Sequence, residues 1–240
     1  MTTLAKITIA LIVALITSSC AFDVNFGAGK KGNGEVVKDR RETTEDFTVV
    51  SASEGLDVFV TQGSDYEITV EADENIIDLI GTDISDGKLK VHTIENIGRA
   101  TKKVYVTLPE VTAMYASSGA DLVSQGVITA DKISLDASSG SDLRIELNAD
   151  EVDADTSSGA DIRITGQANL FLADASSGSD IKAKEFLVKT CHADASSGAD
   201  ITVNVSESLT ADASSGADIS YMGEASVQKK KSVSGSVHKY

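Results

Sequence analysis

The stretch Ala116–Leu122 reads ASSGADL, and this seven-residue phrase or a near copy of it occurs six times in the chain. The later copies begin at Ala137, Thr156, Ala175, Ala195 and Ala213. Their glycines follow one another at steps of 21, 19, 19, 20 and 18 residues. Near-identical phrases at a period of about 20 residues are typical of stacked repeat proteins. The sequence therefore predicts a stack of repeated coils.

Apolar residues recur at every second position on both sides of the phrase. Two positions before the copies stand Met114, Leu135, Ala154, Ala173, Ala193 and Ala211. Directly after the Asp of each copy stand Leu122, Leu143, Ile162, Ile181, Ile201 and Ile219. A period of two predicts strands with one buried face, whereas helices need a period of 3.6. Each unit is predicted to hold two short strands joined at Ser-Ser-Gly, where the glycine supplies φ angles that a side chain would forbid. Short strands bury a core by stacking, so we predict an all-β fold, a parallel β-solenoid with coils of about 20 residues.

Residues 1–20 are predicted to be a lipoprotein-type signal peptide. Lys6 gives a basic start, and the apolar run Ile7–Ile16 is too short to span a bilayer permanently. The following Thr17–Cys20 resembles a bacterial lipobox, in which the cysteine is acylated, although Thr17 stands where Leu is usual. We expect Cys20 to carry lipid and to anchor the exported chain to the outer membrane. The alternative is cleavage after Ala21, which would leave a secreted or periplasmic protein.

The remainder is predicted to form a tether and one domain. Residues 21–41 contain Gly, Lys and Asn without periodicity, which favours a flexible tether. Residues 42–240 are predicted to be a single domain whose N-terminal part is β-rich but irregular. Strands are expected at Phe47–Val50, Leu56–Gln62, Tyr66–Glu71, Lys88–Thr93 and Lys103–Leu108, with a short helical turn at Asn75–Ile80. Ser53–Val58 looks like a worn copy of the phrase, so the solenoid is expected to begin there.

Several motifs resemble one known family. Glu54–Gly63, EGLDVFVTQG, is similar to the opening motif of the head GIN domain family of putative auto-transporter adhesins, common in Bacteroidetes. Val70–Asn75, the Ser-Gly-rich repeats and the closing Ser234–Val237 also follow its pattern, so the resemblance covers about Glu42–Tyr240. It implies a β-helix-like fold, frequent lipoprotein signals and an adhesin role without established catalytic residues. The repeats of this chain are more regular than those usual in the family.

The composition and charge of the chain limit the classes of ligand that it can bind. The formal net charge of −16 and the pI near 4.5 argue against nucleic acid as a ligand. Tryptophan is absent and aromatic residues make up 5% of the chain, which is lean for a carbohydrate platform built on stacked rings. The three lysines Lys229–Lys231 near the C-terminus are expected to protect the open end of the solenoid from pairing with another chain.

Aspartates form the only constellation in the sequence. The first Asp column comprises Asp121, Asp142, Asp161, Asp180, Asp200 and Asp218. The second Asp column, six residues earlier in each unit, comprises Asp136, Asp155, Asp174, Asp194 and Asp212. Stacking at about 4.8 Å predicts lines of carboxylates that stay hydrated, partly offset by Arg144, Arg163 and Lys182. The alternative is that the columns bind calcium. The phrase lacks the glycine pattern of calcium β-rolls, so such binding is expected to be weak, with a dissociation constant of about a millimolar. No metal or cofactor is predicted.

The remaining reactive side chains do not form a site in the sequence. His92, His192 and His238 are scattered and lack zinc-ligand spacing. By strand parity His192 is predicted to face solvent and Cys191 the core.

Two classes of function follow from these observations. The first is a noncatalytic envelope lipoprotein that presents a rigid acidic solenoid for adhesion or for binding a glycan or protein. The second is a carbohydrate-active β-helix enzyme that uses two carboxylates as acid and base. An enzyme site is expected to break the repeat at one coil with clustered acid, base and aromatic residues, and no unit does so. No catalytic residue is therefore assigned.

Overall fold

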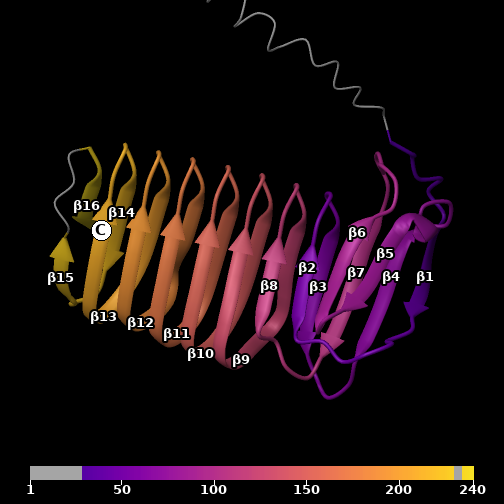
Figure 1. Cartoon of the computed structure of the whole chain (residues 1–240), viewed down its shortest axis with the longest axis horizontal. Coiled ribbons are helices and arrows are strands. Elements are labelled where there is room, and N and C mark those ends of the chain that lie inside the picture. Colours follow the sequence, from indigo (N-terminus) through magenta and orange to yellow (C-terminus); the bar gives the residue numbers. More distant parts are fainter. Residues whose placement is uncertain (1–28, 230–233) are drawn as a thin grey trace, which may run out of the picture.

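The computed structural model describes residues 29–229 and 234–240, and the chain forms a parallel β-solenoid (Figure 1). The main stack consists of β8 (Ala113–Ala116), β9 (Asp121–Ala137), β10 (Asp142–Thr156), β11 (Asp161–Ala175), β12 (Asp180–Ala195), β13 (Asp200–Ala213) and β14 (Asp218–Met222). Each of these strands pairs in parallel with the next one in the chain. The predicted fold class is confirmed.

The repeated phrase forms the sharp corner along one edge of the stack. At Ser118 and Gly119 the φ angles are +53° and +72°, and the amide of Ala120 donates to the carbonyl of Ser117 at 3.1 Å. Two successive positive φ angles closed by this bond define a type I′ turn. The sequence predicted a positive φ angle for the glycine alone, but the serine before the glycine also has a positive φ angle. The amide of Gly119 donates to the carbonyl of Ser139 at 3.2 Å, so the corners also bond to one another.

Each coil strand continues through a bend where the sequence predicted two separate short strands. For example, β10 runs unbroken from Asp142 to Thr156 and pairs with β11 over its whole length. Register shifts lie before the bend, between Arg144 and Glu146 against β9. Such bulges turn a strand without ending it.

The core fills the space between the two faces of the coils. Leu143, Ile162 and Ile181 of the inward column are fully buried. Cys191 is fully buried as predicted, and the rings of Phe171 and Phe186 meet edge to face at 5.4 Å. Burying each large aliphatic side chain contributes about 1.5–3 kcal/mol, and every coil repeats this contribution.

The N-terminal coils stack in an order that differs from the chain order. The coil made by β2 (Val49–Ala52) and β3 (Asp57–Gln62) lies between β8–β9 and the coil made by β6 (Lys88–Thr93) and β7 (Lys102–Leu108). The corner between β2 and β3 has positive φ at Glu54 and Gly55, and the Gly55 amide donates to the Ser118 carbonyl at 3.0 Å. The worn copy is thus confirmed as a stack member. In chain order the solenoid begins with this coil as predicted, although the β6–β7 coil lies further out in the stack.

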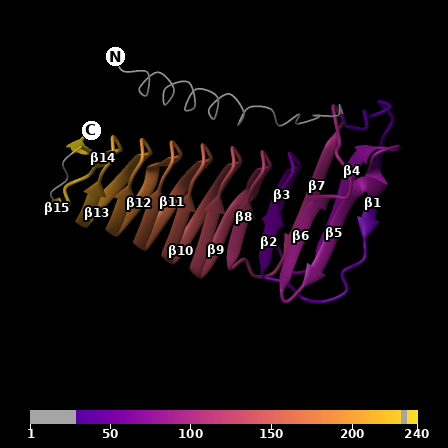
Figure 2. The ribbon, with the colours of Figure 1, turned by 45° about the horizontal axis from the view of Figure 1, so that its top comes forward.

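Antiparallel strands cap this end of the stack (Figure 2). Strand β4 (Glu67–Asp73) pairs antiparallel with β7, and β5 (Ile80–Ser85) pairs antiparallel with β6. The expected helical turn is confirmed as the 3₁₀ helix η1 (Ile77–Leu79). Beyond β4 lies β1 (Val36–Arg41), again antiparallel.

Strand β1 corrects the predicted tether and the domain boundary at residue 42. Its sequence, VVKDRR, lacks apolar alternation, but all six residues pair with β4. Just before it, the amide of Gly34 donates to the buried carboxylate of Asp73 at 2.5 Å, and the amide of Thr101 binds the other carboxylate oxygen at 2.6 Å. Residues 36–41 are therefore part of the domain. Residues 1–28, including the predicted signal and Cys20, lie outside the described residues.

The C-terminal end carries a further, partial coil after the six copies of the phrase. Strand β15 (Ser226–Lys229) pairs with β13, and β16 (Ser236–Lys239) pairs with β14. The amide of Gly216 donates to the carbonyl of Ser234 at 2.8 Å, which continues the line of corners. Lys229 donates to the carbonyl of Val237 at 2.5 Å, across the end of the stack. Its neighbours Lys230 and Lys231 lie outside the described residues.

Candidate functional site

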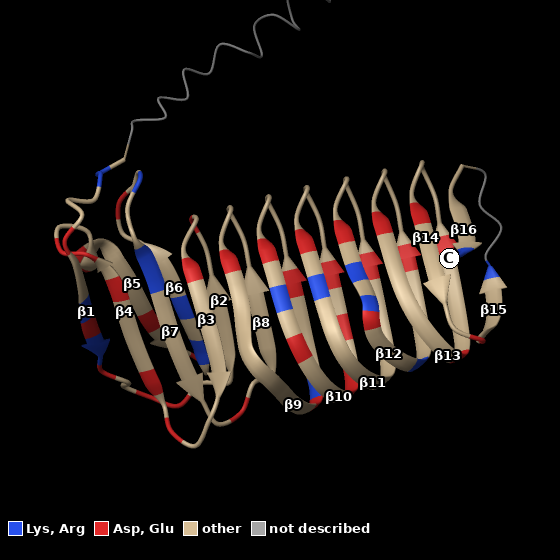
Figure 3. Cartoon of the chain, turned by 180° about the vertical axis from the view of Figure 1, so that it is seen from behind, with Lys and Arg blue, Asp and Glu red and all other residues tan. Residues whose placement is uncertain are grey.

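The first Asp column forms as predicted on one face of the solenoid. Each of its members pairs in register with the next, and Asp57 of β3 extends the line beyond Asp121. Figure 3 shows bands of acidic and basic residues crossing the strands on this side. The corner fixes this register, because the column begins two residues after the glycine in every coil.

Two cations are inserted into the first Asp column. Arg144 lies 3.4 Å from Asp121 and 3.4 Å from Asp142, and Lys182 lies 2.6 Å from Asp161 and 3.0 Å from Asp180. Burial acts to lower the pKa of Lys182, but hydrogen bonds to the two carboxylates raise it above its ordinary value. Arg163, between these two cations, forms no ion pair within residues 29–229 and 234–240. These pairs are about half exposed, so each contributes little to stability.

The second Asp column lies on the opposite face and is also in register. Burial, then repulsion from Asp174, Asp153 and Asp136, raises the pKa of Asp155 above its usual range. Burial, then repulsion from Asp194 and Asp153, raises the pKa of Asp174 in the same way. Along its central part this column is therefore a line of mutually repelling carboxylates.

The carboxylate columns do not form a metal centre. Within the described part of the chain no three His, Cys, Asp or Glu side chains gather in a way that could hold a metal ion.

The histidines and the described cysteine remain apart from one another. His92 lies 2.6 Å from Asp83, His238 lies 3.0 Å from Ser220, and His192 is exposed as predicted. Burial raises the pKa of the Cys191 thiol to about 12, so this side chain is an unreactive part of the core.

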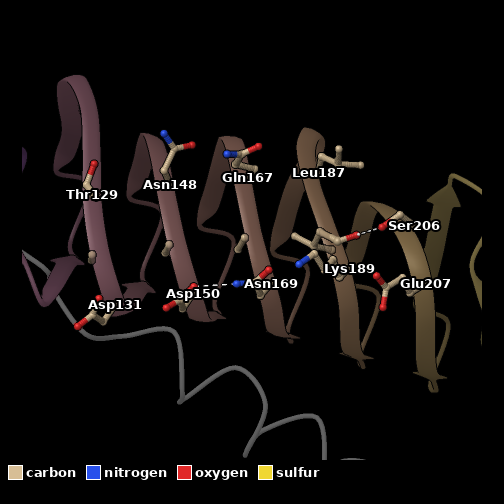
Figure 4. A pocket seen from close by; sticks show the side chains of 14 residues that line it. Thr129, Asp131, Asn148, Asp150, Gln167, Asn169, Leu187, Lys189, Ser206 and Glu207 are labelled. Atoms are coloured by element: carbon tan, nitrogen blue, oxygen red, sulfur yellow. Dashed lines mark hydrogen bonds between the residues drawn. The ribbon is translucent and has the colours of Figure 1, made fainter.

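Sequence reasoning missed a groove that crosses β9–β13 at the bend (Figure 4). We call it the bend groove, and its volume is about 550 Å³. Its floor is the in-register row Ala130, Ala149, Ala168 and Val188. One wall is the row Thr129, Asn148, Gln167 and Leu187, and the other is formed by Asp131, Asp150, Asn169, Lys189 and Glu207. The floor lies low because alanine occupies it in three neighbouring coils.

Local contacts position the walls of the bend groove. Gly166 has a φ angle of +107° and lies against the carbonyl of Leu147, where any side chain would clash, and it places Gln167 in the wall. Asn169 donates to Asp150 at 2.7 Å across neighbouring coils. At the N-terminal end, Gln62 accepts a hydrogen bond from the amide of Thr129 at 2.8 Å and donates to its carbonyl at 3.0 Å. These contacts fix Asn169 in one wall and Thr129 at the N-terminal end of the other.

Comparison with protein families gives one match, to the family described as "Putative auto-transporter adhesin, head GIN domain", over residues 46–225. The chain belongs to this family. The resemblance stated from the sequence motifs is therefore confirmed. None of the curated proteins matches the chain.

Solved structures share the fold of this head GIN domain. A putative adhesin from Bacteroides fragilis superposes with a TM-score of 0.81 at 17% identity, covering 88% of this chain and 100% of that one. A putative adhesin from Parabacteroides merdae gives a TM-score of 0.73 at 18% identity, with coverage of 88% and 98%. A structure named putative lipid binding protein, from Parabacteroides distasonis, gives 0.70 at 17% identity, with coverage of 88% and 99%. At these identities the likeness shows the fold alone.

Three surface features of this head GIN domain are repeated from coil to coil. The described residues contain no helix long and apolar enough to cross a membrane. The predicted site residues form two carboxylate columns on opposite faces, and the unpredicted bend groove lies between them along the strands. All three are repeated features that several coils share.

Proposed function

We propose that this head GIN domain protein is a noncatalytic adhesin of the cell envelope that binds a glycan or a protein. The observation that carries the proposal is that both Asp columns pair in register from strand to strand over β9–β13. Such a stack is a stiff rod on which the same side chains recur at every strand spacing of about 4.8 Å. A repeating surface suits extended or repeating ligands, and membership of an adhesin family supports this use.

The absence of catalysis is part of the proposal. A polysaccharide-cleaving site needs one carboxylic acid and one carboxylate in different environments. Here the carboxylates recur in every coil, and Arg144 and Lys182 each bridge two of them. In β9–β13 the aromatic rings of Phe171 and Phe186 are fully buried, so no aromatic platform stands beside these carboxylates. The recurrence favours a binding surface over an active site.

The anchor is proposed from the sequence. Acylation of Cys20 would hold the exported chain on the outer membrane, while cleavage after Ala21 would release it. The folded domain begins close behind this segment, because Lys30 already bridges to Ile97 and β1 follows at Val36. A lipid at Cys20 would therefore hold the capped end of the rod near the membrane.

Cell fractionation and attachment assays test this proposal together. Cells that produce the wild-type chain should incorporate an alkyne fatty acid into it and attach to surfaces coated with host-matrix or envelope glycans and proteins. Cys20→Ala should lose the label, appear in the periplasm or medium and abolish attachment. An unlabelled wild type would refute the lipoprotein, and equal attachment by cells lacking the protein would refute the adhesin.

A further inference from the structure

We propose that the bend groove binds a linear, uncharged, β-linked hexopyranose chain lying along the axis of the solenoid. This inference rests on the proposed binding function and names its ligand class and its site. The groove crosses five successive strands, so a ligand lying in it runs perpendicular to the strands.

One wall of the bend groove has spare hydrogen-bonding capacity. Asn148 and Gln167 are exposed, lie in register on neighbouring strands, and have no hydrogen-bond partner for their carboxamides among the described residues. Figure 4 shows both side chains standing out from the floor. A carboxamide both donates and accepts, as a sugar hydroxyl does, so the two groups pair well.

The spacing of the wall residues is close to the spacing of rings in an extended sugar chain. The wall repeats at the strand spacing of about 4.8 Å. An extended β-linked hexopyranose chain advances by a similar step for each ring, so successive rings would meet successive wall residues. An extended peptide advances by about 3.3 Å per residue and would fall out of step. Its usual way of binding a sheet, strand addition, is also blocked because the backbone groups of β10–β12 already pair with each other.

The floor of the groove is apolar, and carboxylates predominate along its walls. Ala149 and Ala168 give a flat, apolar floor for the C–H faces of sugar rings, and Leu187, 50% exposed, adds apolar surface to the wall. Asp131, Asp150 and Glu207 outnumber the single cation Lys189 along the groove. A chain of uronic acids would be repelled by this groove and by the net charge of −16.

Isothermal titration calorimetry of the purified full-length protein with cellohexaose and N-acetylchitohexaose tests the proposal. Since the groove has no aromatic ring, we expect a dissociation constant of about 0.1–1 mM for at least one of them. Asn148→Ala and Gln167→Ala should each weaken binding by about three- to tenfold, and the double variant more. Neither amide has a structural partner, so these variants should fold normally.

Gln228→Ala on β15 is the matched control, because it removes an exposed amide outside the groove. It should leave the affinity unchanged. Three results would overturn the proposal: no binding of either sugar at 10-fold the upper dissociation constant, equal affinity in the double variant, or tighter binding of hexagalacturonate. If the cells still attach while any of these results is obtained, the adhesin function stands and only the groove assignment fails.

Discussion

Two neighbouring residues carry the unusual backbone of every corner, and in the fourth copy they are Ser177 and Gly178. Their φ angles are +57° and +68°. A side chain added at Gly178 would have no heavy atom within 4 Å, so space does not select the glycine. The left-handed backbone selects it, because a β-carbon there costs roughly 1–2 kcal/mol. The serine pays a similar cost in each coil, and asparagine would tolerate the same conformation better.

Gly178→Val should therefore destabilise the stack by at least about 1–2 kcal/mol, since a β-branched residue resists positive φ. Ser177→Asn, the matched change one residue earlier, should instead stabilise it by about 0.5 kcal/mol. Denaturant unfolding followed by circular dichroism would measure both. A valine variant with the parental midpoint would show that the corner is misassigned.

The second Asp column yields a prediction with a definite sign. The folded-state pKa values of Asp155 and Asp174 are raised, so the folded chain binds protons more readily than the unfolded chain. These two groups therefore lower the unfolding free energy at neutral pH. The lost stability returns as the pH falls through their folded-state pKa values.

Asp155→Asn should raise the unfolding free energy at pH 7 by about 0.5 kcal/mol, because it removes the cost of burying a carboxylate and then its screened repulsion from Asp174, Asp153 and Asp136. The gain should vanish near pH 3, below the ordinary pKa of an aspartate, because the raised pKa of Asp155 leaves this carboxyl protonated there in the wild type. Asp65→Asn, in a turn outside the column, should change little. Thermal melts at the two pH values decide this, and a loss of stability at pH 7 would mean that the column is held together by bound cations.

At the scale of elements, the regular coils were predictable and the cap was not. The glycine steps and apolar columns predicted β9–β14, because each coil repeats the same local rules. The insertion of the β2–β3 coil between two later ones depends on long-range pairing that no local pattern encodes. Strand β1 was missed because VVKDRR has no apolar alternation. The sequence did not predict the bend groove, because its pattern is weak: alanines at 130, 149 and 168 with polar residues on either side.

The N-terminal cap should need residues 29–41 for its full thermal stability. A chain that starts at Glu42, the predicted boundary, loses β1 and the Gly34 amide that binds the buried Asp73 carboxylate. Leaving that oxygen without a donor costs about 1–3 kcal/mol, so the melting temperature should fall by at least about 3 °C. A chain that starts at Gly29 keeps both contacts and should melt like the parent. Equal melting of the two truncated chains would show that β1 is dispensable.

At the scale of the whole molecule, the protein is a rod with two unlike ends and repeated faces (Figure 1). Antiparallel strands close the N-terminal end, and the partial coil that contains Lys229 ends the other. Between them, carboxylate columns, cation bridges and the bend groove recur from coil to coil. Repetition without a differentiated coil is the property that favours binding over catalysis.

The most direct test of that claim is to ask whether the protein holds a ligand without changing it. The purified full-length protein would be incubated with a panel of envelope and matrix glycans and proteins, and the retained ligand recovered and weighed by mass spectrometry. The account predicts retention of at least one glycan or protein whose mass is unchanged after prolonged incubation. Shortened chains with new reducing ends would contradict it and identify a carbohydrate-active enzyme instead.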